Sequence, residues 1–257
     1  MNRRIVFANR KGGCGKTTTS VNVAAALAHM GSRVLLVDTD PQAHATMSFG
    51  ISTRDGGPGL ADLIRGSATV EATLRNSYIP KLHVLPASRK LADLEREYSH
   101  TGDARFWLRD RLDPLRSRFD VFVFDTPPTT DLLTISAMIG AEEIYVPTQA
   151  HFLAMEGLLE ILDLADEIAR RDNPALAVLG VIPTFYQTGA PFSEEILTEL
   201  RQRMGNEAVL TPVRHNLILA EAPGLGRTIF QHDLRSEAAH DYYRVALQIN
   251  NTNAEAR

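Results

Sequence analysis

The chain has very little cysteine: Cys14 is the only one in 257 residues. A single cysteine excludes a framework of disulfides within the chain and any cluster held by several cysteines of one chain. No stretch approaches the roughly 18 consecutive apolar residues that suggest a membrane-spanning helix. Residues 1–7 run directly into an apolar segment and leave no room for a signal peptide. These absences favour the cytoplasm.

The chain also lacks a large excess of charge of either sign. The chain has 27 lysines and arginines against 31 aspartates and glutamates, a formal net charge of −4. This balance argues against a chain that is basic overall, although a local basic patch is compatible with it. The apolar content of 44% is enough to bury one sizeable core. We therefore expect a single domain over 1–257, with a polar, frayed tail at 250–257.

Short apolar runs alternate with amphipathic stretches along the chain. Runs that predict buried strands lie at 5–8, 34–37, 82–85, 121–124, 144–146 and 177–182. Patterns that predict helices lie at 17–30, 152–171, 193–204 and 234–249. This alternation predicts an α/β fold in which helices cover both faces of a mostly parallel sheet.

The most informative motif connects the first strand to the first helix. Residues 9–19 read NRKGGCGKTTT. Glycines permit positive φ angles and let backbone N–H groups approach phosphate oxygens, and the helix N-terminus adds partial positive charge. Lys16 supplies a charge for the β- and γ-phosphates, and the Thr17 hydroxyl can bind Mg²⁺. The motif predicts a phosphate cradle made of Gly12, Gly13, Cys14, Gly15, Lys16, Thr17 and Thr18.

Two other predicted strands end in aspartate. Residues 34–42 read VLLVDTDPQ, and residues 121–128 read VFVFDTPP. Because ligands of parallel sheets bind beyond the carboxyl ends of the strands, Asp38, Asp40 and Asp125 should face the phosphates. Alternate residues of an extended segment face opposite ways, so Asp38 and Asp40 should have different roles. An apolar strand that ends in aspartate is typical of the residue that holds a water ligand of Mg²⁺, here Asp125.

The glycine-rich loop departs from the common G-x-x-x-x-G-K-[ST] pattern. Arg10 occupies the first glycine position, and a second lysine, Lys11, precedes the glycines. This form, KGGxGKTT, resembles the deviant P-loop (deviant Walker A) of the ParA/MinD/NifH family of dimeric ATPases. The resemblance implies that Lys11 reaches across a dimer interface to the partner's nucleotide. It also implies that Asp40 positions the attacking water and that Asp38 lies near Mg²⁺.

Similarity to ParA proteins continues beyond these motifs. Residues 147–157 resemble the stretch that leads into the ParA dimer-facing helix, and residues 219–229 resemble its C-terminal motif. Residues 213–216 read VRHN where the family has I-P-x-N. The resemblance places Asn216 at the base side of the nucleotide, with Arg214 in the place of the proline. Segment 60–110 matches poorly and is a candidate for partner specificity.

Other branches of the family fit less well. A NifH-like reductase needs two cysteines per chain. A MinD-like protein ends in a basic amphipathic membrane helix, whereas residues 248–257 have no apolar face, so we expect no membrane docking. Four residues precede the first predicted strand, so we expect a short ParA form without an N-terminal helix-turn-helix domain.

Two functions remain open. The resemblance implies a slow Mg²⁺-dependent ATPase that dimerises with ATP, binds nucleoid DNA non-specifically, and positions a plasmid, chromosome region or protein cargo. A ParB-like or other cargo-adaptor protein would stimulate hydrolysis. DNA phosphates would need clustered basic residues, and the candidates are Arg201, Arg203, Arg227 and Arg235. The alternative is a regulatory ATPase that acts only through protein partners, at a cell pole or an apparatus, without DNA.

Overall fold

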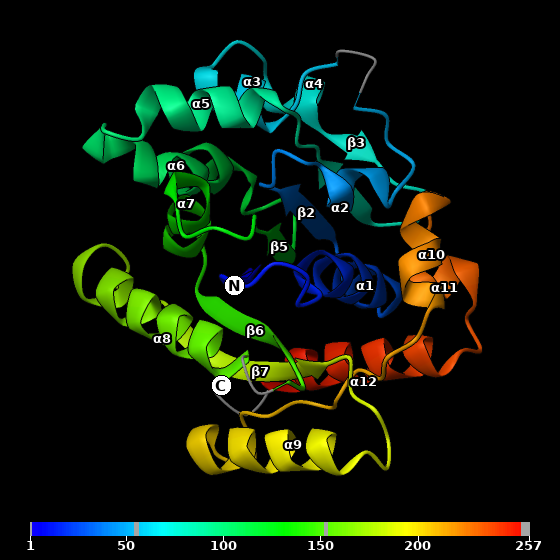
Figure 1. The fold of residues 1–257 in the computed structure, drawn as a ribbon. Coiled ribbons are helices and arrows are strands. Elements are labelled where there is room, and N and C mark those ends of the chain that lie inside the picture. The colour runs from blue at the N-terminus through cyan, green and yellow to red at the C-terminus, as the bar shows by residue number, and fades with distance from the viewer. Residues whose placement is uncertain (1, 54–56, 152–153, 253–257) are drawn as a thin grey trace.

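A sheet of seven strands forms the centre of the computed structural model, which describes residues 2–53, 57–151 and 154–252 (Figure 1). The strand order is β3-β4-β2-β5-β1-β6-β7, and every pair is parallel except the antiparallel pair of β3 and β4. The strands are β1 (Arg3–Phe7), β2 (Val34–Asp38), β3 (Arg75–Asn76), β4 (Leu82–Leu85), β5 (Val121–Asp125), β6 (Glu143–Gln149) and β7 (Ala177–Thr184).

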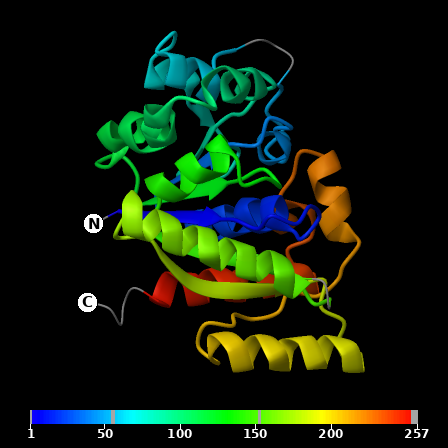
Figure 2. The ribbon, with the colours of Figure 1, turned by 60° about the vertical axis from the view of Figure 1, so that its left-hand side comes forward.

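Helices cover both faces of this sheet (Figures 1 and 2). The α-helices are α1 (Lys16–His29), α2 (His44–Met47), α3 (Leu60–Arg65), α4 (Val70–Thr73), α5 (Lys90–Tyr98), α6 (Trp107–Leu112), α7 (Leu132–Gly140), α8 (Ala154–Arg171), α9 (Pro191–Met204), α10 (Ile218–Gly224), α11 (Ile229–His232) and α12 (Glu237–Thr252). Two 3₁₀ helices, Gly102–Phe106 and Asp113–Leu115, flank α6.

Alternation along the strands explains the two layers. Ile5 and Phe7 of β1 pack into one core with α1, α11 and α12, whereas Val6 packs into the other with α3, α5, α6, α7 and α8. Successive side chains of a strand point to opposite faces, so a strand covered on both faces must be apolar throughout. The continuous apolar runs in the sequence are the consequence of this arrangement.

The predicted α/β fold class is confirmed, and all six predicted strands are present. The helix predicted at 234–249 instead begins at Glu237, because Asp233 and Ser236 form a turn in which Ser236 accepts a hydrogen bond from the Ala239 N–H at 3.1 Å. The helix predicted at 193–204 begins earlier, at Pro191, where the ring pre-sets the helical φ angle. The start of the 152–171 prediction and the end of the tail lie outside the described residues. Among the described helices, none is long and apolar enough to cross a membrane.

Candidate nucleotide-binding site

The glycine-rich loop connects β1 to α1 at the carboxyl edge of the sheet. Gly13 and Gly15 have φ angles of 74° and 88°, where other residues are strained. Two side chains from neighbouring strands hold the loop from behind: Gln149 donates to the Gly13 carbonyl at 2.9 Å, and Thr184 donates to the Cys14 carbonyl at 2.8 Å. With their carbonyls held in this way, the loop amides are free to face an anion.

The two lysines of the loop have different environments. Lys16 is buried, and its ammonium group donates to the Lys11 carbonyl at 3.1 Å, so it lies across the loop. The Lys11 side chain is half-buried, and its ammonium group has no hydrogen-bond or ion-pair partner in the described part of the chain. Lys16 thus completes the cradle of its own loop, and the Lys11 charge remains available to another molecule.

Asp38 and Asp125 lie side by side at the ends of adjacent strands. They are register partners of β2 and β5, and both are fully buried. The Ser20 hydroxyl donates to Asp125 Oδ1 at 2.9 Å, whereas Asp125 Oδ2 is buried without a partner. Burial, and then the neighbouring Asp38, raises the pKa of Asp125 to about 8, although the Ser20 and Thr17 hydroxyls oppose the shift. A buried, unpaired carboxylate oxygen in this position fits a cation nearby.

Asp38 is hydrogen-bonded more completely than Asp125. Its Oδ2 accepts from the Thr46 N–H at 2.8 Å and the Thr46 hydroxyl at 2.7 Å, and its Oδ1 accepts from the Asp40 N–H at 3.1 Å. Burial raises the pKa of Asp38 to about 7. Asp38 therefore ties β2 to α2, and Asp125 rather than Asp38 has the unpaired oxygen.

Mg²⁺ is the cation that best fits this donor set. The described residues contain no group of three or more histidine, cysteine or acidic side chains that could hold a metal. Mg²⁺ suits such a site because it keeps several waters and binds through one or two carboxylates together with substrate phosphates. Thr17, in the first turn of α1, and Asp125 are the residues that would hold it.

Asp40 lies two residues beyond β2 and is 7% exposed. Its Oδ1 accepts from the Gln42 N–H at 2.8 Å, and its Oδ2 has no hydrogen-bond partner in the described structure. The two carboxylates of the DTD segment have separate environments, as the alternation of the segment predicts. Asp40 is the one that can accept a proton from, or orient, a water molecule.

The predicted base-side residues line a small cavity of about 130 Å³ beside Gly15 and Thr18. The Arg214 guanidinium is not free to bind a base, because it forms ion pairs with Asp241 at 2.7 Å and Glu237 at 2.5 Å on α12. Arg214 therefore fastens its loop to α12, and the Asn216 side chain accepts from the Ile218 N–H at 3.1 Å.

Sequence reasoning missed another residue of this cavity. The Phe185 ring lines it from the end of β7, with a φ angle of 54°. Such an angle is uncommon for a bulky residue. Nothing in the sequence around Phe185 predicts that conformation.

The four arginines proposed to contact DNA do not form one patch. Arg201 and Arg203 lie at the C-terminal end of α9, whereas Arg227 and Arg235 flank α11, and these elements lie on different sides of the molecule (Figures 1 and 2). Arg203 forms an ion pair with Glu199 at 2.8 Å. The other three have no ion-pair partner in the described part of the chain.

Comparison with known proteins agrees with this geometry. A family model described as an AAA domain matches residues 2–178. The chain is 37% identical to the chromosome-partitioning ATPase Soj of Thermus thermophilus, over 96% of this chain and 95% of that protein. It is 32% identical to the chromosome partitioning protein ParA of Caulobacter vibrioides, over 96% of this chain and 93% of that protein. The chain belongs to the ParA/Soj family of partitioning ATPases.

Solved structures share the fold of this chain. A Mycobacterium smegmatis protein named cobyrinic acid a,c-diamide synthase, solved with an ATP analogue and magnesium, is 28% identical with a TM-score of 0.86, and the match covers 100% of this chain and 98% of that one. The cell division ATPase MinD of Pyrococcus furiosus has a TM-score of 0.79 at 23% identity, over 98% of this chain and 100% of that one, which shows a shared fold. The predicted ParA-type resemblance and P-loop fold are therefore confirmed.

Proposed function

We propose that this ParA/Soj family member is a slow Mg²⁺-dependent ATPase, and that residues 1–257 form one ATPase domain. Lys16 and the loop amides bind the β- and γ-phosphates, and Thr17 and Asp125 hold the Mg²⁺ that neutralises phosphate charge. Asp40 orients the attacking water. Catalysis rests on positioning and charge neutralisation. A single carboxylate acting on water gives slow hydrolysis, which suits a protein that times a process better than it suits a metabolic enzyme. The bound ATP analogue and magnesium of the M. smegmatis relative support these ligands.

The ATP-bound form is proposed to be a homodimer. The observation that carries this step is the Lys11 ammonium group, which has no partner within the described chain although Lys16 already fills the cis role. In a dimer, Lys11 reaches the partner's nucleotide and adds charge stabilisation there. ATP therefore completes two sites at once, and ADP, which lacks the γ-phosphate, leaves the interface weaker.

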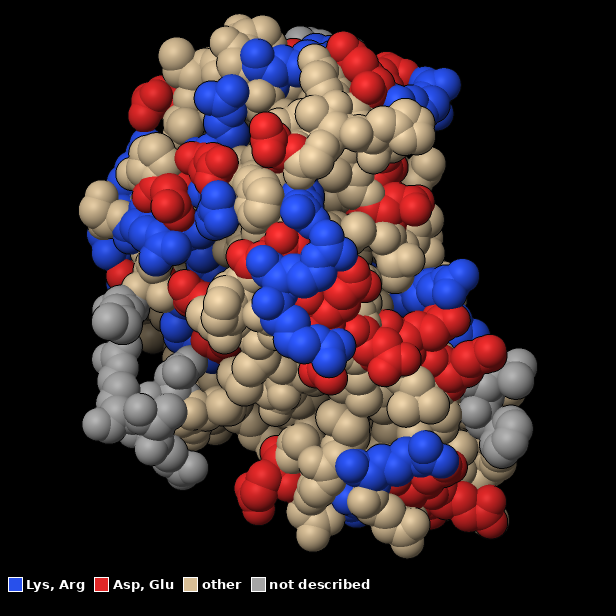
Figure 3. Space-filling model, turned by 90° about the vertical axis from the view of Figure 1, so that its left-hand side faces the viewer, with Lys and Arg blue, Asp and Glu red and all other residues tan. Residues whose placement is uncertain are grey.

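The dimer is proposed to bind DNA non-specifically, and so to associate with the nucleoid in the cytoplasm, without docking to a membrane. The net charge of −4 confines such binding to local patches. Figure 3 shows one face on which lysines and arginines lie among acidic residues, including the bottom of the view where α9 lies. Arg201 on α9 and Arg227 and Arg235 around α11, which have no ion-pair partner in the described part of the chain, are thus better candidates than Arg203, and dimerisation doubles their number.

A cargo-adaptor protein, ParB-like or of another kind, is proposed to stimulate hydrolysis, so that the ATPase positions a plasmid, a chromosome region or a protein assembly. The names of the ParA and Soj relatives support the partitioning role. The competing proposal is a regulatory ATPase that acts only through protein partners. The separation of the four arginines into two places and the Arg203–Glu199 ion pair favour it.

DNA binding separates the two proposals. The Asp40→Ala variant with Mg-ATP should bind arbitrary duplex DNA, and log affinity should fall with log salt by about 0.9 for each phosphate contact. Arg227→Ala and Arg235→Ala should each reduce that slope by about 1.8, because each substitution removes one contact of about 0.9 from each chain of the dimer. Arg203→Ala, whose charge is already paired, is the matched control and should change the slope least. Absence of binding at about 50 mM salt would select the protein-partner function.

A further inference from the structure

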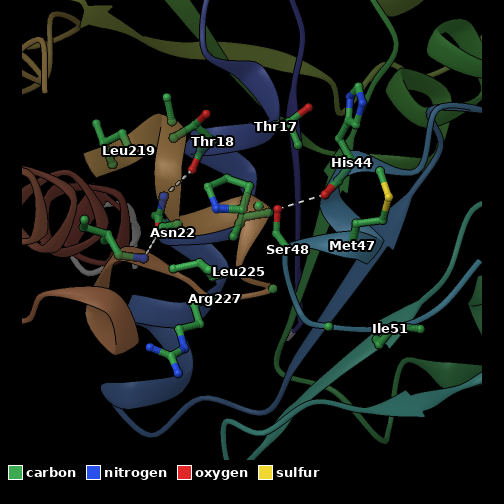
Figure 4. A pocket seen from close by; sticks show the side chains of 18 of the residues that line it. Thr17, Thr18, Asn22, His44, Met47, Ser48, Ile51, Leu219, Leu225 and Arg227 are labelled. Carbon is green, nitrogen blue, oxygen red and sulfur yellow. Dashed lines mark hydrogen bonds between the residues drawn. The ribbon is translucent and has the colours of Figure 1, made fainter. Parts of the chain in front are cut away.

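A second, larger cavity lies beside the nucleotide site. It has a volume of about 660 Å³ and lies between α1, α2 and the α10–α11 segment (Figure 4). His44 and Met47 line the α2 side, and Leu219, Leu225 and Arg227 line the opposite side. We call this cavity the α2–α10 groove. Its lining includes Thr17 and Thr18, assigned above to Mg²⁺ and the phosphates, and Arg227, a candidate DNA contact. No role proposed above uses its other lining residues.

The wall formed by α10–α11 is held in place by backbone contacts. The Ile229 N–H donates to the Asn22 side chain at 2.9 Å, and the Thr228 N–H donates to the Tyr78 hydroxyl at 2.7 Å. At Gly226, which has a φ angle of 65°, an added Cβ would lie 2.9 Å from the Gly50 Cα. The two backbones meet so closely that no side chain fits between them. The groove is therefore built by the fold and does not arise from a loose loop.

Apolar residues line much of the groove, together with Thr17, Thr18, Asn22, His44, Ser48 and Ser52, and Arg227 is the one lysine or arginine in its described lining. Its described residues include no aspartate or glutamate, and Arg227 has no ion-pair partner in the described part of the chain. Leu225 and Met47 at the rim are 60% and 39% exposed, which extends the apolar surface beyond the cavity. A ligand contained in the cavity would leave that rim in water. Apolar surface that continues outside a cavity indicates a macromolecular partner.

We propose that the α2–α10 groove binds an apolar segment of a partner protein, and that the segment carries a carboxylate which pairs with Arg227. Charge complementarity indicates that the segment is acidic. A basic segment would be repelled by Arg227 and would find no aspartate or glutamate among the described lining residues. The apolar side chains of the segment would cover Leu225 and Met47.

A segment bound in the groove would affect ATP hydrolysis through α2. Met47 lines the groove, and the adjacent Thr46 holds Asp38 through two hydrogen bonds. Thr17 and Thr18 line the end of the groove nearest the phosphate cradle. A segment bound against α2 therefore alters the position of the DTD carboxylates. This inference rests on the proposed partner-stimulated ATPase and assigns the surface through which the partner acts.

The test uses the full chain and a phage-displayed library of random short peptides as the probe. Peptides selected on the wild type should share apolar residues and an acidic residue. Leu225→Asp should weaken their binding by roughly tenfold or more, because it removes a buried leucine contact and adds repulsion. Arg227→Glu should weaken it further. Leu234→Asp is the matched control, since Leu234 is 65% exposed and does not line the groove, and it should bind as the wild type does.

The selected peptides should also change the ATP hydrolysis rate of the wild type and of Leu234→Asp, but not that of Leu225→Asp. Equal binding to all variants, a basic consensus, or loss of binding in saturating Mg-ATP would overturn the proposal. The last result would assign the groove to the nucleotide instead. Basal hydrolysis and DNA binding of the same variants are measured separately, so a failed ATPase or DNA assignment is distinguished from a failed docking site.

Discussion

At the scale of single residues, the pair Asp38 and Asp125 dominates the electrostatics of the site. Two fully buried carboxylates lie side by side, and burial raises the pKa of each. Without a cation this arrangement is costly, because buried like charges are poorly compensated. The pair therefore lowers the stability of the Mg²⁺-free protein and favours the binding of Mg²⁺.

Replacement of Asp125 by asparagine should stabilise the Mg²⁺-free protein and weaken its binding of Mg²⁺. Asp125→Asn removes the cost of burying a carboxyl that must take up a proton on folding, and should raise the free energy of unfolding of the nucleotide-free protein by roughly 1–3 kcal/mol at neutral pH. Mg²⁺-dependent ATP binding should be lost. Thermal denaturation and calorimetric titration measure the two effects, and a destabilised variant that keeps its Mg²⁺ dependence would contradict this account of Asp125.

The same carboxylate predicts a pH dependence. The folded pKa of about 8 lies above the ordinary aspartate pKa of 3.8, so the folded protein holds a proton that the unfolded chain releases. The free energy of unfolding of the Mg²⁺-free protein should therefore fall as pH rises between these values. Chemical denaturation across this range should show a shallower fall for Asp125→Asn. An equally steep fall in both proteins would show that other groups are responsible.

Asp40 should be needed for turnover but not for binding. Asp40→Ala removes the water-orienting carboxylate and should slow hydrolysis by about 10²-fold or more if that group acts as a general base. ATP affinity should remain, whereas Lys16→Ala, the control that removes the phosphate-binding ammonium, should lose it. Single-turnover hydrolysis and equilibrium binding separate these outcomes. Turnover near the wild-type rate in Asp40→Ala would assign the role to another group.

Residue positions were predictable where a motif and a strand end coincide. Lys16 follows glycines at a helix start, and Asp38 and Asp125 end apolar runs, so the sequence alone placed them at one edge of the sheet. The roles of Thr46 and Gln149 could not be predicted, because the hydrogen bonds that these residues form depend on the tertiary fold. Their residue types carry no spacing signal.

At the scale of elements, α8 packs directly against the glycine-rich loop. An added Cβ at Gly157 would lie 2.8 Å from Asn9 Oδ1 and 3.6 Å from the Lys11 Cβ. The same Asn9 oxygen accepts from the Lys11 N–H at 3.0 Å. The glycine thus lets α8 fix the position of Lys11, the lysine proposed to act on the partner's nucleotide.

Gly157→Ala should therefore displace Lys11 more than Lys16. We expect the ATP-dependent dimer to weaken by roughly tenfold, which corresponds to about 1.4 kcal/mol, with a smaller effect on ATP binding by the monomer. Sedimentation across a concentration series measures the first quantity, and titration with ATP the second. Gly102→Ala is the control, since an added Cβ there meets nothing within 4 Å. Equal dimer affinity in both variants would contradict the role of this contact.

Element boundaries were less predictable than element types. Apolar runs located the six longer strands because burial on both faces requires them. β3 has only two residues, half-buried and exposed, so no apolar run marks it. The start of α12 depends on the Ser236 cap, and a sequence offers several serines and threonines that could cap a helix.

At the scale of the whole molecule, the homodimer proposed above would give Lys11 a partner that it lacks within the described chain. Lys11 is unpaired within the described chain, and the unpaired arginines lie in separate places. The sequence predicted the dimer only through a family resemblance, since no composition or spacing encodes an interface. The α2–α10 groove could not be predicted from the sequence either, because the segments that form its walls are distant along the chain.

The most direct test of this account is the mass of the Asp40→Ala variant in solution with Mg-ATP and with Mg-ADP. Sedimentation velocity should show a dimer with ATP and a monomer with ADP. Adding Lys11→Ala to the same variant should give a monomer with both nucleotides while ATP still binds. Equal mass with ATP and ADP, or a full ATP dimer without Lys11, would contradict the central claim that ATP closes this site through a lysine from the partner chain.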